Sequence, residues 1–253
     1  YNQFQIPVTK AQHEVVAGDR PLTESELNSL KGFLTEAETA KLTEANKQEA
    51  IPEYWYTAMM NCPPLRKYIE KSDELLLKSV TGIEYKKAQD GENFRVTFHF
   101  AQNRFMENTF LSVLFKMIDE DEVDATEGTE IKWKEGKNLT RKVALKKQKN
   151  KSTGKMREFT EESEVESIFD FFETIESDPH ALNEGPSILV DEEEEDERDE
   201  FLYKNLRIAR IIENELLPFS LEYYLGIRVP DPVFESSDEE SEEEKVENIK
   251  LKQ

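Results

Sequence analysis

The sequence predicts an α+β fold, in which an antiparallel β-sheet packs on helices and a basic β-hairpin stands apart. Apolar residues alternate with polar ones in 94–100 and 109–117, the period of two that is typical of half-buried strands. Apolar residues in 201–217 recur instead at helical spacing, so an amphipathic helix accompanies the strands. With 37% hydrophobic residues and 15 Phe among 253 residues, the chain is able to bury a core.

Three consecutive segments are expected to pair as an antiparallel meander, and they are 81–88, 94–100 and 109–117. An Asp90-Gly91 turn joins the first two segments. Residues 119–130 are expected to form an acidic loop, and the pattern of 132–145 fits a helix as well as a strand.

Helices are expected both before and after the meander. Thr23 and Glu26 form an S/T-x-x-E capping box, which predicts a charged, mostly helical stretch to about residue 48. Residues 163–175 are expected as a helix with apolar residues on one face and acids on the other, and 177–200 as a loop. The other expected helices are 53–61, 65–80 and 201–217.

Charge is distributed unevenly along a chain whose formal net charge is −22. Residues 132–157 carry eleven Lys and Arg against one acid, whereas 158–200 carry nineteen acids against one base. Acidic segments at 119–124, 191–200 and 235–244 repel DNA and anionic lipid, whose binding depends on Lys and Arg. The predicted partner is therefore a basic protein, with no sequence-specific nucleic acid and no membrane.

Nothing in the sequence predicts a catalytic, metal or cofactor site. The three histidines, His13, His99 and His180, lie far apart, and the single Cys62 cannot complete a zinc site with them. No nucleotide-binding or hydrolase motif occurs. The carboxylates lie in solvated runs, whereas acid–base catalysis needs carboxylates in contrasting environments, so an enzyme is the weaker alternative. One cysteine fits a reducing compartment.

Several segments, in order, resemble those of the nucleosome assembly protein family, which includes the SET-type histone chaperones. They are IPEYWYTAMMN (51–61), FRVTFHFAQNRFMENTFL (94–111), TEIKWKEGKNLT (129–140), the hairpin KKQKNKSTGKMR, SIFDFFE and LPFSLEYYLG. The resemblance covers about residues 1–230. It implies a four-stranded antiparallel sheet with helices on its underside and a long upstream helix that pairs two subunits. It also implies ATP-independent handover of core histones to DNA.

The resemblance divides the chain into three parts. Residues 1–48 are expected as the end of the dimerisation helix and a connecting helical segment, 49–230 as the histone-binding α/β domain, and 231–253 as a disordered acidic tail. The chain opens with YNQFQIP rather than Met, so most of the dimerisation helix is expected to precede Tyr1. The full-length protein is expected to be a homodimer, whereas dimerisation of this piece stays open.

The predicted function is a histone chaperone of the cytoplasm and nucleus, which binds core histones through acidic surfaces. The alternative is an acidic adaptor for other basic proteins. The candidate histone-contact residues are acids of the 163–175 segment, the acidic run and the tail: Glu164, Glu166, Asp170, Glu173, Asp191, Glu192, Glu193, Glu194, Glu195, Asp196, Asp238, Glu239, Glu240, Glu242, Glu243 and Glu244.

The stretch KKQKNKSTGK at 146–155 is predicted to form a hairpin with its turn near 152–154. In an acidic chain it is interpreted as a handle for an import receptor, which would bind Lys146, Lys147, Lys149 and Lys151. A solvated hairpin without a partner and contact with the acidic surface of a neighbouring subunit are the alternatives.

Three serines of the acidic tail have an acid three residues on, and they are Ser236, Ser237 and Ser241. This spacing is typical of sites for an acidophilic kinase, and each phosphate would add about −1.5 to −2 charge. The alternative is that these serines stay unmodified.

Overall fold

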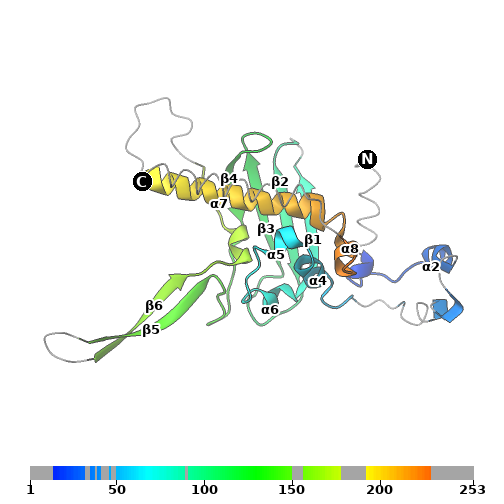
Figure 1. Ribbon diagram of the computed structural model, residues 1–253, viewed down its shortest axis with the longest axis horizontal. Coiled ribbons are helices and arrows are strands. Elements are labelled where there is room, and N and C mark those ends of the chain that lie inside the picture. The colour runs from blue at the N-terminus through cyan, green and yellow to red at the C-terminus, as the bar shows by residue number, and fades with distance from the viewer. Residues whose placement is uncertain are drawn as a thin grey trace.

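The computed structural model describes residues 14–31, 35–37, 39–40, 46, 50–88, 91–149, 156–177 and 192–228. In these ranges a four-stranded antiparallel sheet packs against helices, and a separate two-stranded hairpin projects from that body (Figure 1). This arrangement confirms the expected α+β class. Of the expected dimerisation and connecting segment at 1–48, only 14–31, 35–37, 39–40 and 46 are described, and the expected acidic tail at 231–253 lies outside the described residues.

The sheet has the strand order β1-β2-β3-β4, with β1 Val80–Lys87, β2 Phe94–Phe100, β3 Phe110–Met117 and β4 Val123–Gly128. The first three strands confirm the expected meander. Phe98 lies opposite Ile83 of β1 and Leu111 of β3, and all three side chains are buried. Because side chains alternate along a strand, Arg95 and His99 lie on the other face, which is more exposed.

Strand β4 corrects the expected acidic loop over 119–130, of which only the turn after β3 and the residues beyond Gly128 are irregular. Asp, Glu, Ala and Gly have low strand propensity, so the sequence of β4 gives little local signal. Pairing on both sides overrides that preference. Beyond its ladder with β3, Thr126 exchanges backbone hydrogen bonds of 2.9 and 3.0 Å with Ile175.

The described helices are α2 Glu24–Lys31, α4 Tyr54–Met60, α5 Pro63–Arg66, α6 Glu74–Leu77, the 3₁₀ helix η1 Ile168–Phe172, α7 Glu192–Ile211, the π-helical turn η2 Ile212–Leu216 and α8 Ser220–Tyr224. All of them except α2, which lies to one side of the sheet (Figure 1), contribute to the layer that covers one face of the sheet. Phe98 of β2 contacts the rings of Phe171 and Phe172, with ring centroids 6.5 and 5.3 Å apart. Residues before and after the sheet therefore share one apolar core with its inner face.

The α2 helix confirms the capping box. The Glu26 carboxylate accepts the Thr23 N–H at 2.7 Å, and the Thr23 hydroxyl accepts the Glu26 N–H at 3.3 Å. An ion pair with Arg20 further lowers the pKa of Glu26, to about 2. The described helix ends at Lys31, so the helical stretch expected to about residue 48 is described only in part.

Residues 163–175 do not form the expected amphipathic helix. Strand β6 runs to Glu164, η1 follows as one short 3₁₀ helix, and the chain is extended again at Ile175. Four of the five η1 residues are buried and only Asp170 is partly exposed, so η1 has no acidic face open to solvent as the expected helix would. Gly128 is required beside η1, because a Cβ there would collide with the Phe172 carbonyl.

The single helix expected over 65–80 is interrupted, and α5 and α6 are its two ends. The buried Asp73 carboxylate accepts the Glu70 N–H at 3.1 Å, a local bond that competes with the helical ladder. The same carboxylate accepts the Ser167 hydroxyl at 2.7 Å and the Ile168 N–H at 3.0 Å. Asp73 thus joins the segment between α5 and α6 to the start of η1.

Helix α7 extends into the acidic run that was expected to be a loop, since it begins at Glu192. Carboxylates in a first turn interact favourably with the positive end of the helix dipole, and the amphipathic segment that follows holds the helix in place. At the other end Pro218 lacks an N–H, and the helix widens into η2, where the Leu217 N–H bonds to the Ile212 carbonyl at 3.0 Å.

The basic hairpin is confirmed in its two strands, β5 Arg141–Lys149 and β6 Met156–Glu164. Residues 132–140 are irregular, so the ambiguous segment becomes a strand only from Arg141. The register places Arg141 opposite Glu164 and Lys147 opposite Glu158. The expected turn near 152–154 lies outside the described residues.

Replacing Asp73 with Ala is expected to lower the free energy of unfolding by about 2 kcal/mol or more, because it leaves buried N–H and O–H donors without an acceptor. Urea denaturation followed by circular dichroism measures the change. Glu107→Ala, which removes an exposed carboxylate, serves as the control and is expected to change stability little. Equal stability of the two variants would contradict the structural role of Asp73.

Candidate functional site

Two acidic segments that are far apart in the sequence meet beside α7. The turn between β3 and β4 and the start of β4 bring the carboxylates of Asp121, Glu122 and Asp124, and α7 brings that of Asp199. Between them lies a groove of about 330 Å³, called the acidic groove below. It is lined by Ile118, Asp121, Glu122, Val123, Asp124, Arg198, Asp199, Leu202, Tyr203 and Leu206.

Asp119 shapes the turn side of the acidic groove. Its carboxylate accepts the N–H groups of Asp121 at 2.9 Å and Glu122 at 3.0 Å, an arrangement typical of Asx-turns. The Ile118 N–H donates to the Glu122 carbonyl at 2.9 Å and closes the turn. The turn backbone is therefore fixed, and the residues Asp121 and Glu122 are exposed beside the groove.

The helix side of the groove is one face of α7. Asp199, Leu202, Tyr203 and Leu206 follow the i, i+3, i+4 and i+7 spacing that aligns side chains on a helix. Leu202 and Leu206 are buried and form an apolar floor, whereas Tyr203 is 62% exposed. Across the groove Ile118 is 55% exposed, so apolar and acidic side chains lie next to one another.

Arg198 holds the two sides of the groove together. Its guanidinium donates to the carbonyls of Asp124 at 2.6 Å and Glu176 at 3.2 Å, and to the Asp199 carboxylate at 2.8 Å. The Asp124 carboxylate in turn accepts the Ser177 hydroxyl at 2.6 Å. The groove lining therefore carries four carboxylates against one guanidinium, and this cation is already engaged within the fold.

The acids predicted from the 163–175 segment lie outside the acidic groove. Glu164 and Glu166 are exposed at the base of the hairpin, where Arg141 lies 3.9 Å from Glu164. Partial burial and the nearby Glu164 carboxylate raise the pKa of Glu173. Asp170 does not face solvent as expected, because its carboxylate accepts the Ser167 N–H at 3.0 Å and completes a capping box.

Most other predicted site residues are described in part or not at all. The structure places the backbone of Glu192, Glu193, Glu194, Glu195 and Asp196 in the first turns of α7, but their side chains are not described. Lys146, Lys147 and Lys149 lie on β5, and their side chains are not described either. The remaining predicted residues, which lie outside the described ranges, are Asp191, Lys151, Asp238, Glu239, Glu240, Glu242, Glu243, Glu244, Ser236, Ser237 and Ser241.

Sequence reasoning noted the acidic character of 119–124 and 191–200 but did not single out the groove. The residues it missed are Ile118, Asp121, Glu122, Asp124, Asp199 and Tyr203. The helical spacing of Asp199 and Tyr203 was readable from the sequence. Their proximity to the β3–β4 turn was not, because it depends on how α7 crosses the sheet.

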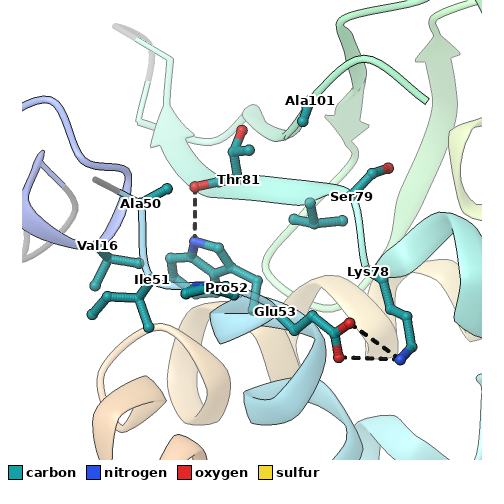
Figure 2. A pocket seen from close by; sticks show the side chains of 11 residues that line it. Val16, Ala50, Ile51, Pro52, Glu53, Lys78, Ser79, Thr81 and Ala101 are labelled. Carbon is teal, nitrogen blue, oxygen red and sulfur yellow. Dashed lines mark hydrogen bonds and ion pairs between the residues drawn. The ribbon is translucent and has the colours of Figure 1, made fainter. Parts of the chain in front are cut away.

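A second hollow, of about 130 Å³, lies where the segment around Val16 meets the start of α4 and of β1 (Figure 2). Its lining is mostly apolar, and the Trp55 indole N–H donates to the Thr81 carbonyl at 3.1 Å. Glu53 and Lys78, its charged lining residues, pair with one another at 3.1 Å. It therefore offers no free charge and no pair of contrasting carboxylates for catalysis.

Within the described ranges, no group of His, Cys, Asp and Glu is arranged to hold a metal ion. None of the helices described is long and apolar enough to cross a membrane. Burial raises the pKa of the Cys62 thiol to about 11, so the thiol stays protonated at neutral pH and is a poor nucleophile.

The family model described as nucleosome assembly protein (NAP) matches residues 1–227 of this chain. The chain belongs to the nucleosome assembly protein family. This membership confirms the resemblance seen in the sequence. The family's histone chaperones are non-enzymatic, which confirms the expectation that the chain is not an enzyme.

Individual nucleosome assembly proteins are similar over most of the chain. "Nucleosome assembly protein 1;2" of Oryza sativa subsp. indica is 29% identical over 237 residues, which are 93% of this chain and 61% of that protein. "Nucleosome assembly protein 1-like 4" of Mus musculus is 31% identical over 215 residues, 79% of this chain and 54% of that protein. The chain thus spans less than two thirds of the length of these curated relatives.

Solved structures of the family share the fold. "Nucleosome Assembly Protein 1 from Plasmodium knowlesi" aligns with a TM-score of 0.58 at 22% identity, covering 90% of this chain and 82% of that chain. A nucleosome assembly protein from Plasmodium falciparum aligns with a TM-score of 0.53 at 21% identity, covering 90% and 81%. At these identities the likeness concerns the α+β architecture alone.

The capping carboxylate of η1 predicts a pH-dependent stability. Burial raises the pKa of Asp170 to about 6, above the value of about 3.9 in an unfolded chain. Because the pKa is higher in the folded than in the unfolded state, protonation of Asp170 stabilises the fold. This contribution is complete below about pH 3.9 and is lost as the pH rises through about 6. The free energy of unfolding is therefore expected to gain a contribution from Asp170 between about pH 7 and pH 5.

Urea denaturation midpoints at about pH 5 and pH 7 test this expectation. Asp170→Asn keeps an oxygen that accepts the Ser167 N–H but removes the titration, so its midpoint should change less with pH than that of the wild type. Glu166→Gln, an exposed neighbour, is the control and should keep the wild-type pH dependence. Equal slopes for Asp170→Asn and the wild type would contradict the assignment.

Proposed function

We propose that the chain is a histone chaperone that binds core histones through acidic surfaces, assists ATP-independent nucleosome assembly and shuttles histones between cytoplasm and nucleus. Membership in the nucleosome assembly protein family implies a role of this kind. The observation that carries the proposal is the convergence of two acidic segments, from the β3–β4 turn and from α7, on one groove of a domain whose chain has a net charge of −22.

Electrostatics explains why such a surface suits histones. Core histones are rich in Lys and Arg, which bind DNA phosphates without sequence preference. Carboxylates on a rigid domain compete with those phosphates and raise the rate of encounter with a cationic partner. The attraction is screened beyond about 8 Å at physiological salt, so it acts mainly on partners that are close to the surface.

The proposed contacts comprise the groove carboxylates and most of the acids selected from the sequence. Asp121, Glu122 and Asp199 are exposed on the described surface. Glu164, Glu166 and Glu173 form a second exposed group near the hairpin base. The acids of 191–196 and of the tail 238–244 are included in the proposed contacts on the basis of sequence alone. Asp170 has a capping role instead.

Neutralising three acids of the groove, with Asp121→Asn, Glu122→Gln and Asp199→Asn, is expected to weaken binding of a core histone dimer by about tenfold at low salt. The substitutions remove charge while keeping side-chain size. Isothermal titration calorimetry at about 0.1 and 0.5 M NaCl measures the change, and the difference between variant and wild type should shrink as salt screens the charges.

The matched control neutralises three exposed acids near the opposite end of the sheet, with Glu107→Gln, Glu130→Gln and Glu135→Gln. It changes the net charge by the same amount, so its smaller effect would localise the binding surface. Equal weakening by both triple variants would show that total charge alone matters. Absence of histone binding to the wild type at low salt would refute the proposed function.

The alternative function is an acidic adaptor for other basic proteins. Lysozyme is a basic protein without a histone fold, so comparing its affinity with that of a core histone dimer distinguishes the two functions. A histone chaperone should bind a core histone dimer much more tightly than lysozyme at the same salt, whereas an adaptor selected by charge alone should bind both alike.

The basic hairpin is proposed to bind an import receptor. It projects from the body of the domain (Figure 1), and its register places Glu164 opposite Arg141 at its base and Glu158 opposite Lys147 further along the strands. The stretch 146–155 itself contains no acid. Lysines are thus dense in a stretch that lies outside the acidic segments of the sequence.

Replacing Lys146, Lys147, Lys149 and Lys151 with Ala is expected to reduce nuclear accumulation while leaving histone affinity within about twofold. Fluorescence microscopy of a tagged chain measures the first effect and calorimetry the second. Unchanged import would support the alternative of a solvated hairpin. Collapse of histone binding would instead place the hairpin in the binding surface.

The remaining parts of the proposal concern organisation and modification. We propose that 1–48 belongs to a dimerisation and connecting segment, that 49–230 is the histone-binding domain and that 231–253 is an acidic tail. We also propose a homodimer of the full-length protein and phosphorylation of Ser236, Ser237 and Ser241. Added phosphate charge would strengthen capture of basic partners.

A further inference from the structure

We propose that the acidic groove binds a basic protein segment through a large apolar side chain flanked by Lys or Arg, so that this site selects for an apolar anchor as well as for charge. The inference rests on the proposed function for the class of partner. It goes beyond that function in specifying what the groove recognises.

The apolar part of the groove is the first argument. Tyr203 of α7 and Ile118 of the β3–β4 turn are 62% and 55% exposed, and the buried Leu202 and Leu206 of the core line the same groove. A site for charge alone needs no apolar lining. Burying a Leu or Phe side chain against such a lining stabilises a complex by about 1.5–3 kcal/mol, which corresponds to at least tenfold in affinity.

The charges around the groove are the second argument. Carboxylates of Asp121 and Glu122 stand on one side and Asp199 on the other, and within the described residues no ion pair engages the first two. The cation of the lining, Arg198, donates to Asp199 and to two backbone carbonyls. A cationic side chain beside a bound anchor would therefore meet the carboxylates of Asp121 and Glu122, whereas Asp199 on the α7 side is paired with Arg198.

Rigidity is the third argument. The Asp119 carboxylate fixes the turn through two backbone N–H groups, and Arg198 ties the turn side of the groove to α7. A groove that is already formed loses little conformational entropy when it binds. The apolar lining and the acids consequently act together on one ligand segment.

A second copy of the chain fits this groove less well. Its most basic segment, 132–157, carries Leu145 among lysines, but there the strand pairing places acids of β6 opposite it, with Glu161 opposite Ala144 and Glu158 opposite Lys147. The rest of a second copy is acidic and would bring like charges together. A basic partner with an apolar anchor satisfies both halves of the lining.

The experiment uses the full chain and two labelled peptides of equal Lys and Arg content. One peptide carries a central Leu-Phe pair, and the other carries Ser-Ser at the same positions. Fluorescence anisotropy should give an affinity about tenfold higher for the Leu-Phe peptide. Because apolar contact is not screened by ions, this ratio should persist at about 0.5 M NaCl, while both affinities fall.

The variant that tests the site is Ile118→Ser with Tyr203→Ser, which removes apolar surface and no charge. It should abolish the preference for the Leu-Phe peptide. The matched control is Leu225→Ser with Ile227→Ser. These two apolar residues follow the end of α8 and are 57% and 68% exposed. The control should keep the full preference, and circular dichroism checks that both variants remain folded.

Three outcomes would overturn the inference. Equal affinity for the two peptides would show that the groove recognises charge alone. Loss of the preference in the control as well as in the groove variant would place the apolar contact elsewhere. Wild-type self-association that the groove variant abolishes, measured by sedimentation, would assign the groove to a second copy.

A core histone dimer, titrated in parallel, separates this inference from the proposed function. Histone binding by the wild type together with equal peptide affinities would refute the anchor and leave the chaperone function standing. A preference for the Leu-Phe peptide without histone binding would support the anchor and refute the chaperone function.

Discussion

A sheet with one apolar face must have that face covered, and this constraint determines most of the structure. The inner residues of β2 and β3 are nearly all phenylalanine, valine or leucine, and they lie against η1 and the helices. Burial of this surface is the main term that favours folding. Asp73 and Gly128 matter because they let η1 approach closely, the first through three hydrogen bonds and the second by lacking a side chain.

Covering the sheet also creates the acidic groove. Helix α7 contacts β4 near its first half, through Arg198, and the β1–β2 end of the sheet near its last turn, where the Arg210 guanidinium lies 5.3 Å from the Phe94 ring centroid. Its acidic N-terminal half is consequently held beside the acidic β3–β4 turn. Repulsion between these segments costs free energy, and a basic partner would remove that cost.

The two charged regions of the chain are kept apart by the same architecture. The lysines of the hairpin lie on strands that project from the domain, whereas the groove carboxylates lie on its body (Figure 1). Acids of β6 lie opposite basic residues of β5 near the hairpin base. The hairpin therefore does not neutralise the groove, and each region is free to meet a different partner.

The sequence by itself determined those elements whose spacing of apolar, polar and capping residues is visible along the chain. Alternation in β2 and β3, the capping box at Thr23 and Glu26, and the apolar face of α7 were all predictable, because periodicity follows directly from backbone geometry. Strand β4, the break between α5 and α6, and the 3₁₀ form of η1 were not predictable, because they depend on pairing with β3, on the buried Asp73 and on the burial of four of the five residues of η1. The sequence also showed an acidic chain directly, and from its charge predicted a basic partner. Only the tertiary structure decided which acids share one groove with Ile118 and Tyr203, since that proximity arises from packing between distant segments.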